Sequence, residues 1–315
     1  MLRGLFLLFL LSVALFARSF EEIKNSKTLK VAMRQNSMTY SIDKDKIIPG
    51  FDYALALEFS KFLDTKLEIV PVHMFRDYWF RDGKLIFKSP PPVTPDIFDK
   101  ADMTLDIISK NKKREKYISM IPYIQNKTII FSNKDSNIKT VEDLIGKQVL
   151  LFEGMQSQYL LEKILKKKNI DFKTFSSKYD EKSKKMIIDK SYKNSKDTVN
   201  FILINRKEKM PFLYVYLSVY QKDVDASSTD AFSLFQKLHE YEYLKDDLIP
   251  AFTLDENMGY LSATMPKQKH ELKEKFSEFI EISKKNGLLN KLMKEYLNID
   301  LQTYSKILEY HENKK

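Results

Sequence analysis

The residue types that most often carry metal or covalent chemistry are sparse and scattered in this sequence. The 315-residue chain has no cysteine, which excludes disulfides, thiolate zinc sites, cysteine nucleophiles and lipid-anchored cysteines. Its seven glycines form no GxGxxG or GxxxxGK[ST] motif, so phosphate-binding loops lack their sequence signal. The four histidines show no HxxxH spacing: His73, His239, His270 and His311. We therefore expect no catalytic triad, no metal site and no cofactor.

Two segments have compositions that could serve a small anion. Gly154–Ser157 precedes a predicted helix, where free backbone N–H groups and the positive end of the helix dipole suit a carboxylate, although an ordinary strand-to-helix turn has the same pattern. Residues 110–116 contain five basic side chains, a run that composition alone assigns to a solvated surface. The sequence therefore offers binding chemistry more readily than catalytic chemistry.

The amino-terminal segment predicts export. An arginine precedes an apolar run from Leu5 to Phe16, and Ala17 follows it, as in a secretory signal peptide of residues 1–17. The run is short for a bilayer-spanning helix, which needs about 20 residues, although an uncleaved anchor is the alternative. We expect a periplasmic protein that is not a lipoprotein. Its net charge of +10 comes from lysines scattered among acids, so we expect no nucleic-acid partner.

The elements needed to position a site follow an alternating strand and helix pattern. Thr28–Met33 predicts a strand, Phe51–Leu63 an amphipathic helix and Leu67–Val70 a second strand, which indicates an α/β sheet. Phe75–Asp96 is rich in aromatic residues and contains three consecutive prolines, so it predicts a long irregular excursion.

A second unit repeats this alternation. Lys178–Thr198 is polar and lysine-rich, and we predict a helix with loops there; Asn205–Pro211 resembles a hairpin or an inserted loop. The other predicted strands are 102–108, 127–132, 147–152, 224–228 and 258–265. The other predicted helices are a short one at 141–144, 156–168, a helix from 231, and 271–297 with a break near Gly287, and residues 304–315 are expected to be helical or frayed.

Six sequence blocks occur in an order that is known from one protein family. They read, in chain order, LKVAMRQNSMTYSI with IPGFDYALALEFSKFL, DMTLDIISKNKKREKYISMIPY, IKTVEDLIGKQVLLFEGMQSQYL, VDASSTDAFSLF, MGYLSATMPK and NGLLNKLMKEYL. Together they cover roughly residues 28–297. In this order the chain resembles the family 3 extracellular solute-binding proteins, the amino-acid receptors of ABC importers.

This resemblance implies an α/β fold of the periplasmic-binding-protein-like type II, with two α/β lobes joined by a two-strand hinge. Carried onto this chain, one lobe comprises residues 20–124 plus 260–315 and the other residues 125–259. The family captures a small zwitterionic or carboxylated ligand between the lobes by hinge closure. We expect a monomer without enzymatic activity, whose partner is a membrane permease or a membrane sensor.

The resemblance also implies which side chains bind the ligand. Arg114 matches the arginine that pairs with the ligand carboxylate, a role that its planar guanidinium suits better than lysine would. Asp230 matches the carboxylate that holds the ligand amino group, and its place before a helix also suits an N-cap. Tyr40 matches the aromatic residue that stacks on the ligand, with Trp79 or Phe75 as a second wall; the alternatives are core packing for Tyr40 and loop anchoring for Trp79. The other candidates are Ser109, Asn111, Gly154, Gln156 and Ser157.

The sequence departs from the family pattern near the predicted site. Asn111 occupies a threonine position, Ile107 a glycine position, and Lys112-Lys113 replace a proline-glutamate pair. The segment Phe75–Ala101 replaces a short helix. Two other functions therefore remain as alternatives. One is a sensing or partner-binding module without transport, which an exposed apolar patch would indicate. The other is a dehydratase-like enzyme, which needs only a positioned acid or base in the cleft.

Overall fold

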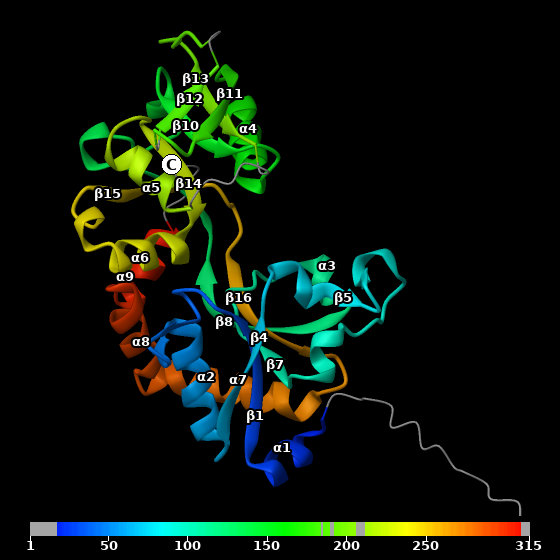
Figure 1. Cartoon of the computed structure of the whole chain (residues 1–315). Coiled ribbons are helices and arrows are strands. Elements are labelled where there is room, and N and C mark those ends of the chain that lie inside the picture. Colours follow the sequence, from blue (N-terminus) through cyan, green and yellow to red (C-terminus); the bar gives the residue numbers. More distant parts are fainter. Residues whose placement is uncertain (1–17, 184, 190–191, 206–211, 310–315) are drawn as a thin grey trace, which may run out of the picture.

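The computed structural model describes residues 18–183, 185–189, 192–205 and 212–309. These residues form two mixed α/β lobes, each built on one large sheet (Figure 1). Strands β8 (Ile118–Asn126) and β16 (Gly259–Pro266) lie side by side and pass between the lobes. The predicted leader and all of the predicted insert after Asn205 fall outside the described residues.

The first sheet has five strands in the order β4-β1-β7-β16-β8. Strand β1 lies parallel to β4 and β7, whereas β16 lies antiparallel to β7 and β8. The predicted opening of strand, helix and strand is confirmed. These three elements are β1 (Thr28–Arg34), α2 (Phe51–Phe62) and β4 (Lys66–Val72). Helix α1 (Phe20–Ser26) precedes them, and strand β7 (Met103–Thr104) follows later in the chain.

The two faces of the first sheet are covered by different structures. Because side chains alternate along a strand, Val31 and Met33 of β1 join the core formed with α2, α7 (His270–Lys285) and α8 (Leu288–Leu297), whereas Ala32 faces the other way. Ala32 packs in a separate apolar cluster with Tyr78 and Trp79. The proline-rich excursion therefore covers a sheet face. Its short elements are η1 (Phe75–Trp79), β5 (Phe80–Arg81), β6 (Lys84–Leu85), η2 (Ile86–Lys88) and η3 (Asp96–Asp99).

The second sheet has seven strands in the order β12-β11-β13-β10-β14-β9-β15. Helix α4 (Gln156–Lys167) packs on one face against Val149 and Leu151, and α5 (Leu213–Tyr220) and α6 (Ala231–Glu240) pack on the other. The central strands are β9 (Thr128–Asn133), β10 (Gln148–Phe152), β13 (Val199–Ile204) and β14 (Ala226–Asp230), and β15 (Leu248–Thr253) is the edge strand beside β9.

The helix predicted within Lys178–Thr198 is wrong. Strand β11 (Phe172–Asp180) lies parallel to β13, and β12 (Lys185–Ile188) pairs with β11 in antiparallel fashion. Lysine-rich composition disfavours a central strand, but β12 is the edge of the sheet, where charged residues are common. Sheet pairing therefore overrides the local preference.

The two lobes are joined at a tight crossing. Strand β8 continues through Lys127 into β9, and β15 leads back into β16. Gly259 packs against the main chain of Asn126, because a Cβ atom at position 259 would lie 2.7 Å from the carbonyl oxygen of Asn126. A glycine is required for this close approach.

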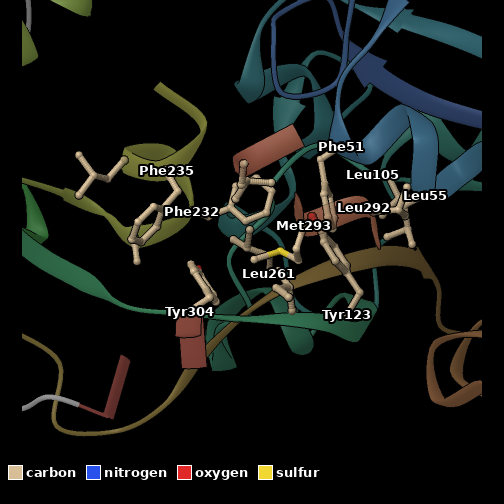
Figure 2. Packing of buried hydrophobic residues seen from close by; sticks show 14 of the residues in the cluster. Phe51, Leu55, Leu105, Tyr123, Phe232, Phe235, Leu261, Leu292, Met293 and Tyr304 are labelled. Atoms are coloured by element: carbon tan, nitrogen blue, oxygen red, sulfur yellow. The ribbon is translucent and has the colours of Figure 1, made fainter. Parts of the chain in front are cut away.

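The lobes also share one continuous apolar core beside the hinge. Figure 2 shows Phe232 of α6 next to Phe51 and Met293; the rings of Phe51 and Phe232 are 5.1 Å apart and nearly perpendicular, at 81°. Tyr304 of α9 (Leu301–Glu309) packs edge-on against Phe235, at 5.8 Å between ring centroids. Helices α6, α8 and α9 lie along one side of the hinge strands (Figure 1).

Candidate ligand-binding site

The carboxyl ends of the parallel strands in both sheets lie toward the hinge. In the first sheet, β16 starts at the hinge and lies antiparallel to β7, so β7 and its parallel neighbours β1 and β4 end there. In the second sheet, Thr128 at the hinge pairs with Asp230, the last residue of β14, and β10 and β13 run parallel to β14. Ligands of open α/β sheets bind outside the carboxyl ends of the strands. The loops after these strands therefore form the candidate site.

Arg114 lies in the first-lobe part of this site. The short helix α3 (Lys112–Glu115) begins after Asn111, whose side-chain oxygen accepts a hydrogen bond from the Arg114 amide at 2.9 Å. The guanidinium donates to the carbonyl oxygen of Ser109 at 2.6 Å and lies 4.8 Å from the Trp79 ring and 5.4 Å from the Phe75 ring. Burial lowers the pKa of Arg114. Among the residues that the structure describes, no carboxylate forms an ion pair with it.

A second arginine, which the sequence did not indicate, lies on the same aromatic ring. Arg34, the last residue of β1, is 5.0 Å from the Phe75 ring, so two guanidinium groups flank this ring. Arg34 forms a two-point pair with Asp106, at 2.5 and 3.0 Å, and the Tyr78 hydroxyl donates to Asp106 at 2.7 Å. Burial raises the pKa of Asp106, and its bonds to Arg34 and Tyr78 oppose that rise. Asp106 therefore neutralises Arg34, whereas Arg114 has no carboxylate partner within the described part of the chain.

A buried carboxylate anchors the loop that carries Ser109 and Arg114. Asp52 has no solvent exposure and accepts hydrogen bonds from the Ile107 amide at 2.7 Å and the Tyr123 hydroxyl at 2.9 Å. Burial raises the pKa of Asp52 to about 7. Ile107 has φ +47°, a left-handed conformation that strains a β-branched residue. The resemblance noted in the sequence analysis predicts a glycine at this position.

Tyr40 is buried at the start of β2 (Tyr40–Asp43), which pairs with β3 (Lys46–Pro49). Its side chain is 5% exposed, and its ring centroid lies 6.5 Å from that of Tyr53. Burial raises the pKa of its hydroxyl. The structure therefore places Tyr40 in the core beside the site.

Asp230 lies at the hinge, in the second-lobe part of the site. It is the N-cap of α6, where its carboxylate accepts from the Ser233 amide at 3.0 Å and the Ser233 hydroxyl at 2.6 Å. The Asn126 side chain donates to it at 3.0 Å. Asn126 was not indicated by the sequence, and it connects the end of β8 to this carboxylate.

The turn before α4 also lies at this edge. Gly154 has φ +69°, and its amide donates to the side-chain oxygen of Gln158 at 2.8 Å. The N-cap residue of α4, Met155, gives the first turn no side-chain cap. Gln156 is exposed and Ser157 is half-buried. The turn therefore presents main-chain N–H groups at the carboxyl end of β10.

The predicted site residues fall into three groups. Ser109, Asn111 and Trp79 each contact Arg114 in the first lobe. Asp230 and the turn 154–157 belong to the second lobe, and Tyr40 is in the core. Within the described ranges, no hydrogen bond or ion pair joins Arg114 to Asp230 or Tyr40.

The described part of the chain contains neither a candidate metal-binding cluster nor a candidate membrane-spanning helix. There, no three histidine, aspartate or glutamate side chains gather closely enough to hold a metal ion. In the same residues, no helix combines the length and apolar character that a bilayer-spanning segment requires.

The sequence profile of the bacterial extracellular solute-binding proteins, family 3, matches residues 98–299, and the chain belongs to this family. The predicted family and the predicted type II fold are both confirmed. The family consists of ligand-binding proteins, so binding of a small molecule is its general function. No curated protein shows a significant sequence match.

Solved structures of similar fold include amino-acid-binding proteins and an enzyme. An ancestral cationic amino acid solute-binding protein has a TM-score of 0.60 and 20% identity, covering 88% of this chain and 98% of that one. A polar amino acid ABC uptake transporter substrate-binding protein from Streptococcus thermophilus has a TM-score of 0.60 and 15% identity, covering 92% and 94%. An ancestral cyclohexadienyl dehydratase has a TM-score of 0.52 and 18% identity, covering 90% and 98%. At these identities the likeness concerns the fold.

Proposed function

We propose that this protein is a periplasmic solute-binding protein that captures a small carboxylated ligand, such as an amino acid, between its lobes for import by an ABC-type transporter. In this proposal residues 20–124 and 260–315 form one lobe and residues 125–259 the other, and residues 1–17 direct export. The partner is a membrane permease. The observation that carries the proposal is that Arg114 is half-buried, is held by Ser109 and Trp79, and has no ion-pair partner among the described residues.

Arg114 has the geometry of a carboxylate anchor. A guanidinium has five N–H donors, and the structure uses one of them for the Ser109 carbonyl. Contact with the Trp79 ring fixes the orientation of the group, and half-burial removes part of its hydration. A partly buried cation is stabilised by a hydrogen-bonded anion. A ligand carboxylate supplies that anion.

Asp230 supports a ligand that also carries an amino group. A carboxylate has about four lone-pair positions, and three of those on Asp230 accept bonds from Asn126 and Ser233. The fourth remains for a ligand ammonium group. The helix-capping role of Asp230 is compatible with this contact because capping uses only part of its acceptor capacity.

A thermal-shift screen with amino acids and with organic acids that lack an amino group tests the proposal. A ligand at 100 times its Kd should stabilise the protein by about 2.7 kcal/mol. Arg114→Ala should weaken the binding of any hit by about tenfold to a hundredfold, since charge-assisted bonds contribute about 1.5–3 kcal/mol. Arg76→Ala is the matched control, because Arg76 is an exposed arginine of the same lobe.

Four outcomes decide between the functions. Loss of binding in Arg114→Ala with normal binding in Arg76→Ala supports the carboxylate anchor. Equal affinity of Arg114→Ala and Arg76→Ala for the ligand contradicts the carboxylate anchor. The absence of any hit in the screen contradicts import of amino or organic acids. Turnover of a prephenate-like acid by the wild type would replace the binding function by the dehydratase alternative.

A further inference from the structure

The carboxyl-terminal helix α9 crosses the hinge. It starts after a tight turn in which Asn298 has φ +54° and the Asn290 side chain accepts from the Leu301 amide at 2.9 Å. It contacts α8 and β8 in the first lobe and β15 in the second. It also lies beyond residue 299, where the match to the family profile ends. This helix therefore contacts both lobes and lies outside the part of the chain that matches the family profile.

Tyr304 is the residue by which α9 reaches the hinge. Its side chain has no solvent exposure, and its hydroxyl proton is shared between the carbonyl oxygen of Gln125, at 3.1 Å, and the side-chain oxygen of Asn126, at 3.3 Å. Its ring packs on Phe235 of α6. One side chain thus contacts the last two residues of β8 and a helix of the other lobe. Figure 2 shows Tyr304 beside Phe235 of that helix.

Asn126 extends this contact into the second lobe. Its side-chain oxygen also accepts from the Phe232 amide at 3.1 Å, while its NH₂ group donates to Asp230. Asn126 is 6% exposed, so these bonds replace solvent. The result is a continuous buried chain of hydrogen bonds from Tyr304 to the first turn of α6. Such a chain resists rotation of α6 relative to β8, because rotation would leave buried polar groups unpaired.

The contact between α9 and β15 borders a surface pocket. Ile307 lines this pocket of about 300 Å³ together with Ile129, Lys139 and residues 250–253. The pocket lies beside the α9 contact with the second lobe, apart from the buried hydrogen bonds of Tyr304.

We infer that α9 is a hinge clamp: Tyr304 and Asn126 are positioning residues that hold the angle between the lobes in the ligand-free protein. The clamp acts on lobe geometry and does not depend on the proposed function. Its second effect, the orientation of Asp230 toward a ligand, rests on that function. A hydrogen bond of this kind contributes enough to change the ratio of two lobe arrangements by about two- to tenfold.

Distance measurements between spin labels in the two lobes test the clamp. The chain has no native cysteine, so Glu274→Cys on α7 and Lys163→Cys on α4 give one label on an exposed position of each lobe. Tyr304→Phe removes only the hydroxyl, and Asn126→Ala breaks the chain at its centre. Tyr216→Phe is the matched control, because its hydroxyl is also buried but bonds Thr229 within the second lobe, at 3.2 Å.

Without ligand, Tyr304→Phe and Asn126→Ala should each broaden the interlobe distance distribution or add a second distance, while Tyr216→Phe keeps the distribution of the wild type. The clamp is overturned if Tyr304→Phe leaves the distribution unchanged, or if Tyr216→Phe broadens it equally. Circular dichroism checks that each variant is folded. If Tyr304→Phe does not fold, the distance distribution of Asn126→Ala, compared with that of the wild type, tests the clamp. Because no ligand is present, failure of the ligand screen leaves this result intact.

Discussion

Two carboxylates without solvent exposure lie close to the candidate site, and their surroundings differ. Asp106 pairs with Arg34 and accepts from Tyr78, whereas Asp52 accepts only from the uncharged Tyr123 hydroxyl and the Ile107 amide. Burial raises the pKa of both, and for Asp52 to about 7. The two groups therefore affect stability in different ways.

We expect Asp52 to make the protein less stable as the pH rises from about 4 to 7. With its pKa raised to about 7, Asp52 should keep its proton in the folded protein up to about that pH, whereas the unfolded chain loses it near the ordinary value of 3.8. Asp52→Asn should remove this pH dependence of the free energy of unfolding. The stability of the variant relative to the wild type should therefore improve by up to about 4 kcal/mol between pH 4 and pH 8. Urea unfolding at several pH values measures the effect. Parallel pH profiles for the two proteins would show that Asp52 is ionised when folded.

The Arg34–Asp106 pair should show strong coupling. Arg34→Met leaves Asp106 buried without its cation and should cost about 3–5 kcal/mol of stability. The double variant Arg34→Met/Asp106→Asn should recover part of this loss, because it also removes the uncompensated charge. Additive effects within about 0.5 kcal/mol would contradict the pairing.

The sequence could indicate single candidate site residues but not their partners. Arg114 and Asp230 follow from motif order, and Asp230 as an N-cap follows from its position before a helix. Arg34 and Asp106 are 72 positions apart, and Asn126 and Asp230 are 104 apart, so no local pattern connects them. Ile107 is a partial exception, because its departure from the family glycine falls where the backbone has a positive φ.

At the scale of elements, periodicity predicted the segments whose own side chains form the core. Strand β1 and helices α2 and α4 are of this kind. Strands β11 and β12 could not be predicted, since the sheet and not the local composition determines them. Strand β15 was also missed; its partner β9 lies more than a hundred residues earlier in the chain.

The crossing of β8 and β16 should tolerate no side chain at position 259. In Gly259→Ala the new methyl group meets the Asn126 carbonyl oxygen, so the strands must separate, at a cost of about 1–3 kcal/mol. Ser262→Ala on the same strand is the control: the Ser262 hydroxyl has no hydrogen-bond partner among the described residues, so its loss should be neutral or stabilising. Equal melting temperatures for wild type and Gly259→Ala would contradict the tight crossing.

At the scale of the whole molecule, the continuous core implies that the lobes unfold together. Phe232 belongs to the second lobe but packs on Phe51 of the first. Phe232→Ala should therefore lower the free energy of unfolding of both lobes by about 3–5 kcal/mol. Hydrogen exchange in β1 and β10 should then accelerate to the same extent. Acceleration confined to β10 would show that the lobes are independent folding units.

Trp79 is the only tryptophan in the chain, and the Arg114 guanidinium lies 4.8 Å from its ring. Indole emission responds to charge placed near the ring. A carboxylate that reaches Arg114 would therefore change the intrinsic fluorescence of the protein, and a simple optical titration of the unlabelled chain could follow occupancy of the site.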